Sequence, residues 1–167
     1  MRSIIVAGAG LVLLAIGSNI HADEQKVALK DVPKVVLDAV KAKFPGAELT
    51  GAEKETEDGK TSYEVSLKQG GQNIDVGISA EGKITEIEKE IATKDVPAAV
   101  TTAVGAKYPN SMLKKAEEII KIEGGKETKN YEVIVVTAAK KTIEVVVSPQ
   151  GKILEEEGKA GEGEDKE

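Results

Sequence analysis

Apolar residues recur at helical spacing in two segments of the chain that nearly repeat each other. The first segment is KDVPKVVLDAVKAKFPGA, beginning at Lys30, and the second is KDVPAAVTTAVGAKYPNS, beginning at Lys94. The apolar stripe of the first consists of Val32, Val35, Val36, Ala39, Val40 and Phe44. That of the second consists of Val96, Ala99, Val100, Ala103, Val104 and Tyr108. This spacing predicts one amphipathic helix in each segment.

The residues that flank the first stripe predict where its helix begins and ends. Asp31 is expected to cap the N-terminus, and Pro33 is expected in the first turn, where its missing N–H costs little. Pro45 is expected to end the helix, because the residue before a proline avoids the helical region. The second segment carries the same three signals at Asp95, Pro97 and Pro109.

The hydrophobic period changes from 3.6 to 2 after each predicted helix. In the first copy, Tyr63, Val65 and Leu67 alternate with polar residues, and glycine-containing pairs at 58–59, 70–71 and 81–82 are typical of hairpin turns. The segments 47–55 and 111–123 are predicted to be the first strands of the two copies. The second of these segments has helical propensity of its own, which the repeat overrules. The pattern therefore predicts an α+β fold in which each copy is one helix packed on an antiparallel sheet of about four strands.

Matches between the copies continue beyond the helices. Tyr-Glu-Val begins at Tyr63 and again at Tyr131, and Gly-Lys-Ile begins at Gly82 and again at Gly151. Matches in a fixed order over so many positions predict two tandem repeats, residues 23–91 and 92–157. A single unit of this size has a small core, so the two are expected to stabilise each other by packing together or by joining their sheets edge to edge.

The two ends of the chain differ in composition from the repeats. Arg2 precedes the apolar run IIVAGAGLVLLAIG, and a small residue stands at Ala22. These features are typical of a secretory signal peptide over residues 1–22, with retention as an anchor as the alternative. Residues 158–167 lack large apolar side chains and are expected to form a disordered acidic tail. We therefore expect a secreted or periplasmic protein that has no membrane attachment after signal cleavage.

Composition excludes several functions. The chain has no Cys, a single His and a net charge of −6. Nucleophilic sites built on Cys or His and ordinary zinc sites are therefore not expected, and acidic surfaces disfavour nucleic acid. We predict no enzyme activity, no catalytic or metal-binding residue and no cofactor. Weak calcium binding stays open as an alternative, through the carboxylates of Glu155, Glu156, Glu157, Glu162, Glu164 and Asp165.

The order of the motifs resembles that of PepSY-like domains. In the first copy the motifs are Val32-Pro33, Phe44-Pro45, Tyr63-Glu64-Val65 and Gly82-Lys83-Ile84. In the second copy they are Val96-Pro97, Tyr108-Pro109, Tyr131-Glu132-Val133 and Gly151-Lys152-Ile153. The resemblance implies small exported α/β modules related in fold to the β-lactamase inhibitory protein, itself a tandem of two such units. It also implies extracytoplasmic binding, including inhibition of peptidases or other hydrolases.

One difference between the copies points to a contact surface. The outward strand face of the first copy is polar, whereas in the second copy Ile134, Val136 and Val146 also point away from the helix. Because exposed apolar patches tend to mark interfaces, we hypothesise that these three residues bind a partner and that Glu132 and Glu144 flank them. The alternative is that they are buried within the chain.

These observations predict a non-catalytic binding module whose partner is another exported protein. Inhibition of a peptidase or other hydrolase is one form that such binding takes in the family. Two other functions stay open: a structural or self-associating envelope protein, and an acidic cation-binding protein.

Overall fold

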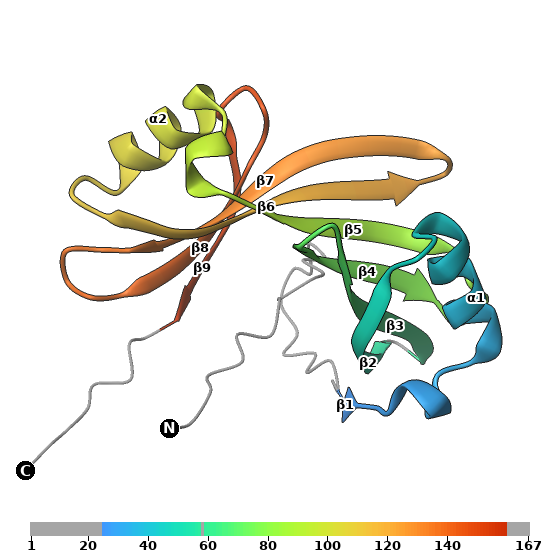
Figure 1. Ribbon diagram of the computed structural model, residues 1–167. Coiled ribbons are helices and arrows are strands. Elements are labelled where there is room, and N and C mark those ends of the chain that lie inside the picture. The colour runs from blue at the N-terminus through green and yellow to red at the C-terminus, as the bar shows by residue number, and fades with distance from the viewer. Residues whose placement is uncertain (1–24, 58, 160–167) are drawn as a thin grey trace, which may run out of the picture. The chain divides into compact units, whose positions relative to one another are not determined.

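The computed structural model describes residues 25–57 and 59–159 (Figure 1). Within these ranges the chain forms nine strands, two α-helices and two short 3₁₀ helices. In chain order they are β1 (Gln25–Lys26), η1 (Leu29–Asp31), α1 (Lys34–Lys43), β2 (Glu48–Glu57), β3 (Lys60–Gln69), β4 (Gln72–Ser79), β5 (Ile84–Ile91), η2 (Thr93–Asp95), α2 (Ala98–Lys107), β6 (Met112–Glu123), β7 (Lys126–Val136), β8 (Thr142–Val147) and β9 (Ile153–Lys159).

The strands form one sheet in which the spatial order is the chain order, from β1 to β9. β5 pairs antiparallel with β6, from Glu86 opposite Lys121 to Ile91 opposite Ala116. The predicted α+β fold, with two repeats that each pack one helix on an antiparallel sheet of about four strands, is therefore wrong, although the two predicted sheets do join edge to edge, which was one of the two arrangements expected. The described chain is mostly β, with a single nine-stranded sheet and two short α-helices. The physical reason is that an edge strand leaves unpaired N–H and C=O groups, which β5 and β6 satisfy for each other.

The two helices end as predicted, but they begin differently. Pro33 and Pro97, in extended conformation, are the N-cap residues, and neither helix start has a side-chain capping hydrogen bond. Asp31 and Asp95 lie earlier, at the ends of η1 and η2. The prediction that the aspartates cap the helices is therefore wrong, because each aspartate ends a short 3₁₀ helix and an extended Val-Pro pair separates it from the α-helix.

The described residues divide into two compact units, residues 25–57 and 59–69 with 75–85, and residues 70–74 with 86–159. In the first unit, α1 buries Val36 and Val40, and β3 buries Val65 and Leu67. In the second unit, α2 lies against one face of the strands β6 to β8 (Figure 1). Each unit thus buries part of the predicted apolar stripe of its helix, but Val35 and Ala99, which the stripes also included, are exposed.

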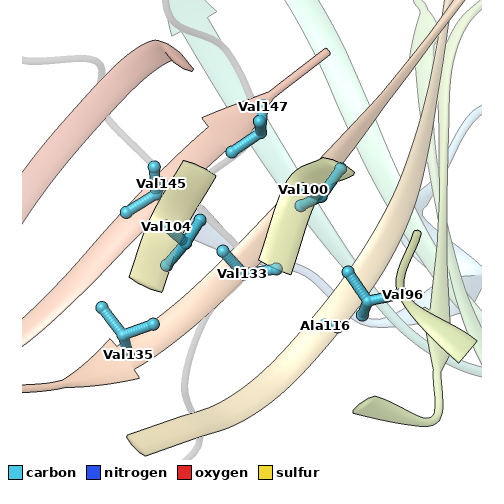
Figure 2. Packing of buried hydrophobic residues seen from close by; sticks show 8 residues of the cluster. All are labelled: Val96, Val100, Val104, Ala116, Val133, Val135, Val145 and Val147. Atoms are coloured by element: carbon cyan, nitrogen blue, oxygen red, sulfur yellow. The ribbon is translucent and has the colours of Figure 1, made fainter. Parts of the chain in front are cut away.

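The core of the second unit consists largely of valine. Figure 2 shows side chains of α2 facing those of β7 and β8, in a cluster of Val96, Val100, Val104, Ala116, Val133, Val135, Val145 and Val147. The inward orientation predicted for the valines of β7 and β8 is thereby confirmed. Each fully buried valine contributes roughly 1.5–3 kcal/mol to folding. Packing against α2 therefore determines which face of the sheet is buried.

The glycine of each Gly-Lys-Ile motif closes a hairpin against a helix. Gly151 has a φ of +84°, its amide donates to the Ser148 carbonyl at 2.9 Å, and a Cβ at this position would lie 2.6 Å from the carbonyl oxygen of Ala99 in α2. Gly82 has the same φ, and a Cβ there would lie 3.0 Å from the Val35 carbonyl oxygen in α1. The motif recurs because both the turn and the close approach to the helix require glycine.

Two predictions concern the ends of the chain. The predicted signal peptide, residues 1–22, lies outside the described residues, as do residues 160–167 of the predicted tail. Gly158 and Lys159, which were also assigned to the tail, belong to β9. Among the described residues, neither helix has the length and apolar character needed to cross a membrane.

Candidate functional site: an acidic sheet face

The face of the second unit's sheet that points away from α2 is rich in glutamate. Side chains alternate between the two faces along a strand, so the neighbours of the core valines in sequence lie on this second face. We call it the acidic face and define it by its buried carboxylates, Glu86, Glu88, Glu117, Glu132 and Glu144. These residues come from β5, β6, β7 and β8.

Two of these glutamates stand directly opposite each other. Glu117 of β6 pairs with Glu132 of β7, and Glu117 also pairs on its other side with Glu90 of β5. Glu117 is only 4% exposed and Glu132 only 7%. Like charges directly opposite each other destabilise a sheet, so this arrangement has a cost in stability.

Two lysines offset part of the charge on the acidic face. The ammonium nitrogen of Lys115 lies 2.8 Å from a carboxylate oxygen of Glu117, and that of Lys121 lies 3.9 Å from Glu86. The Glu132 carboxylate is attracted by Lys115 but repelled by the carboxylates of Glu117, Glu144 and Glu86. Among these carboxylates, that of Glu132 is therefore less well neutralised than that of Glu117.

The environment of Glu132 changes its titration. Burial raises the pKa of Glu132 to about 7, and the carboxylates of Glu117 and Glu144 act in the same direction, while Lys115 opposes them. Burial also raises the pKa of Glu86, against the effect of Lys121. Glu132 therefore exchanges its proton near neutral pH, where most carboxyl groups are fully ionised.

The structure brings all five residues of the predicted contact surface together on this face. Across β7 and β8, Glu132 is opposite Val146 and Ile134 is opposite Glu144, with Val136 next along β7. Glu132, Ile134 and Glu144 are buried, whereas Val136 and Val146 are partly exposed. The apolar surface is thus less exposed than the sequence predicts, and its role in binding stays a prediction.

Sequence reasoning missed one residue of this surface, Met112. It pairs with Val136 across β6 and β7 and is 59% exposed, which makes it an accessible apolar side chain at the edge of the acidic face. A register shift between Leu113 and Lys115 places Met112 on the same side as Lys115. Simple alternation through this segment would put Met112 on the helix side with Ala116, so the sequence carries no signal for it.

The acidic face offers partial ligation for a hard cation. Carboxylate oxygens of Glu88 and Glu117 lie within 4.8 Å of each other. Calcium takes six to eight oxygen ligands, of which this pair supplies a small part.

The carboxylates that the sequence offered for calcium do not converge in the described part of the chain. Glu155 and Glu157 pair with Val146 and Glu144 on one face. Glu156 instead accepts hydrogen bonds from the Lys107 ammonium and the Tyr108 hydroxyl, and Lys107 and the Glu156 carboxylate also form an ion pair. The remaining candidates, Glu162, Glu164 and Asp165, lie outside the described residues.

Comparisons with known proteins define the class to which this fold belongs. The family model described as "Putative beta-lactamase-inhibitor-like, PepSY-like" matches residues 18–86 and residues 61–155. The two matches overlap and together span most of the chain, so the protein belongs to this family, as the motifs predict. No curated protein matches the sequence.

Two crystal structures of low sequence identity share the fold. A protein from Bacteroides eggerthii, described as a "putative periplasmic protein", superposes with a TM-score of 0.63 at 16% identity, over 76% of this chain and 88% of its own. A BLIP-like protein from Bacteroides fragilis superposes with a TM-score of 0.57 at 20% identity, over 81% of this chain and 91% of its own. The first description agrees with the secreted or periplasmic location that the sequence predicts.

Proposed function

We propose that this chain is an exported, non-catalytic module that binds another exported protein through the acidic face of its second unit. The observation that carries the proposal is the pair of opposed, buried glutamates, Glu117 and Glu132, beside the apolar residues Ile134, Val136 and Val146. Like charges in contact reduce stability, and groups with strongly perturbed titration are found preferentially at functional sites. A basic side chain of a partner would neutralise the Glu132 carboxylate, whose charge the neighbouring carboxylates disfavour.

Family membership supports the kind of function, and the acidic face supports a partner that presents a basic side chain. Membership of a β-lactamase-inhibitor-like family supports protein binding in general. We extend this to inhibition of a peptidase or other hydrolase whose surface presents a lysine or arginine next to apolar residues. Such a partner would bury Met112 and place its cation over Glu132, where exclusion of water strengthens the interaction.

The same charges disfavour self-association through this face. Two copies that met face to face would bring the glutamates of one copy towards those of the other, and like charges in close contact suppress such pairing. A self-associating envelope protein would therefore need another surface.

The substitution Met112→Lys is expected to abolish or strongly weaken partner binding without unfolding the protein. Because Met112 is 59% exposed, a lysine is tolerated there. The new cation repels a basic partner and competes for the carboxylates, which should weaken binding about tenfold or more. The measurement is capture of exported proteins from the source organism on the immobilised chain. The captured protein is then identified and purified, and its affinity for the wild type and for the variant is measured by titration.

The matched control is Val35→Lys, which alters an exposed valine of α1 in the other unit. This variant should capture the partner as well as the wild type does, and added salt should weaken capture by both. If Met112→Lys retains full capture, the acidic face is not the contact surface. If the wild type retains only further copies of itself, the chain is a self-associating protein instead.

A further inference from the structure

A pocket of about 340 Å³ opens beside α2, within the second unit. Its lining comes from η2, from α2, from the residue before β6 and from the facing strands. We call it the α2 pocket and define it by Thr93, Lys94, Thr101, Gly105, Ser111 and Leu113. Its volume is at the lower end of the range, roughly 300–1,000 Å³, in which proteins bind small molecules.

The pocket exists because two positions of α2 carry small residues. Thr101 and Gly105 are four residues apart and so share one side of the helix. The repeat places Leu37 and Lys41 at the corresponding positions of α1, 64 residues earlier. The second copy therefore lacks the larger side chains that the first copy has at these two positions.

Gly105 is not required by the backbone. It lies inside α2, and a Cβ added to it would meet no atom within 4 Å. Glycine within a helix is destabilising relative to alanine, so neither packing nor helix stability accounts for it. What Gly105 provides is open space beside Thr101.

The lining of the α2 pocket has an apolar floor and a polar rim. Val104, Leu113 and Val135 supply the floor. Lys94 and Ser111 supply donors at the rim, whereas the Thr101 hydroxyl already donates to the Ala98 carbonyl at 3.1 Å. No carboxylate lines the pocket, and Lys94 forms no ion pair with the described residues. The charge of the rim is therefore positive.

We propose that the α2 pocket binds a small carboxylic acid, whose carboxylate is held by Lys94 and whose short apolar chain lies over Val104 and Leu113. A carboxylate matches the ammonium group and the Ser111 hydroxyl, since charge-assisted hydrogen bonds to carboxylates are the stronger ones. The volume fits a short chain and excludes a long lipid. This site lies on the helix side of the sheet and is independent of the partner proposed for the acidic face.

The test is a titration of the full chain with sodium octanoate, followed by the amide NMR signals of Thr101, Gly105 and Ser111. These signals are expected to shift together and to saturate. Octanol, which has the same chain without the charge, should bind about tenfold more weakly, because a hydrogen-bonded charge is lost. The variant Lys94→Met should reduce octanoate affinity to that of octanol, whereas Lys114→Met, another exposed lysine near the start of β6, should leave it unchanged.

Filling the pocket gives a second, independent result. Gly105→Leu should lower octanoate affinity at least about tenfold without lowering the melting temperature, because leucine is a better helix former than glycine. Thr101→Leu, which installs the residue of the first copy, should do the same and serves if Gly105→Leu folds poorly. Unchanged binding in both filled variants, or signal shifts only outside the pocket, would overturn the proposal. Equal affinity for octanoate and octanol would overturn the role given to Lys94.

Discussion

Replacing Gly151 with alanine is expected to lower the free energy of unfolding by roughly 3 kcal/mol. The turn between β8 and β9 holds Gly151 at a φ of +84°, a conformation that costs an L-residue about 1–2 kcal/mol. The new Cβ would also lie 2.6 Å from the Ala99 carbonyl oxygen. Because this atom belongs to the backbone of α2, the helix or the hairpin has to move. Urea denaturation followed by circular dichroism measures the loss.

Gly125→Ala is the matched control for this substitution. Gly125 has almost the same φ, +82°, but nothing lies within 4 Å of its added Cβ. It should therefore show only the conformational cost, about 1–2 kcal/mol. The difference between the two variants measures the close contact between the hairpin and α2. Equal losses would mean that the hairpin yields without strain and that the contact with Ala99 does not hold the helix.

This contact explains why Gly-Lys-Ile is one of the motifs that recur in the two copies. Gly82 and Gly151 lie more than 60 residues apart in the sequence. Each nevertheless lies in a hairpin turn that packs closely against the backbone of the helix in its own unit. Both need the same residue for the same two reasons, positive φ and close approach. The motif is therefore a reliable marker of the helix–hairpin unit and carries no information about binding.

Local structure was predictable because periodicity and turn residues determine it. The apolar stripe that ends at Tyr108 predicts α2 correctly, and the repeat correctly identifies residues 111–123 as a strand despite their helical propensity. Helix starts were not predictable, because Asp31 looks like a capping residue. Nothing in the local sequence indicates that Asp31 ends a 3₁₀ helix of its own and that Pro33 takes the N-cap position instead.

The continuity of the sheet was not predictable from either repeat alone. Whether β5 ends a sheet or pairs with β6 depends on hydrogen bonds between backbone groups, which every residue other than proline can form. Side-chain alternation is the same in both cases. The sequence therefore indicates the strands and their faces but not which strands become neighbours across the repeat boundary.

The sequence predicted which residues lie on the acidic face, but it did not predict which of their charges face each other. Alternation correctly places Ile134, Val136 and Val146 away from α2, with Glu132 and Glu144 beside them. Glu132 and Glu117 lie opposite each other because of the register between β6 and β7. A bulge in β6 sets part of that register. Met112 joins the surface for the same reason. The pattern of residues along one strand does not show which charged residues pair with each other across two neighbouring strands.

The second large effect is expected from Glu132→Gln, which should make the protein more stable at pH 8 by up to about 3 kcal/mol and leave it nearly unchanged at pH 4. The pKa of Glu132 is about 7 in the folded protein and 4.5 for an ordinary carboxyl group. The folded chain therefore binds more protons than the unfolded chain between these values. Its stability falls as the pH rises from about 4.5 to about 7 and levels off above. Glutamine does not ionise, so the variant does not lose stability over this pH range. Each unit of difference in pKa corresponds to about 1.4 kcal/mol in the free energy of unfolding.

Urea denaturation of both proteins at intervals between pH 4 and pH 8 gives the difference in stability directly. Glu117→Gln should reduce the pH dependence in part, because the Glu117 carboxylate helps to raise the pKa of Glu132. Glu127→Gln, an exposed residue of β7 that does not contribute to this shift, should run parallel to the wild type. A difference between Glu132→Gln and wild type that stays constant across this range would show that Glu132 keeps an ordinary pKa. The acidic face would then be fully charged at neutral pH, and its attraction for a basic partner would not depend on protons.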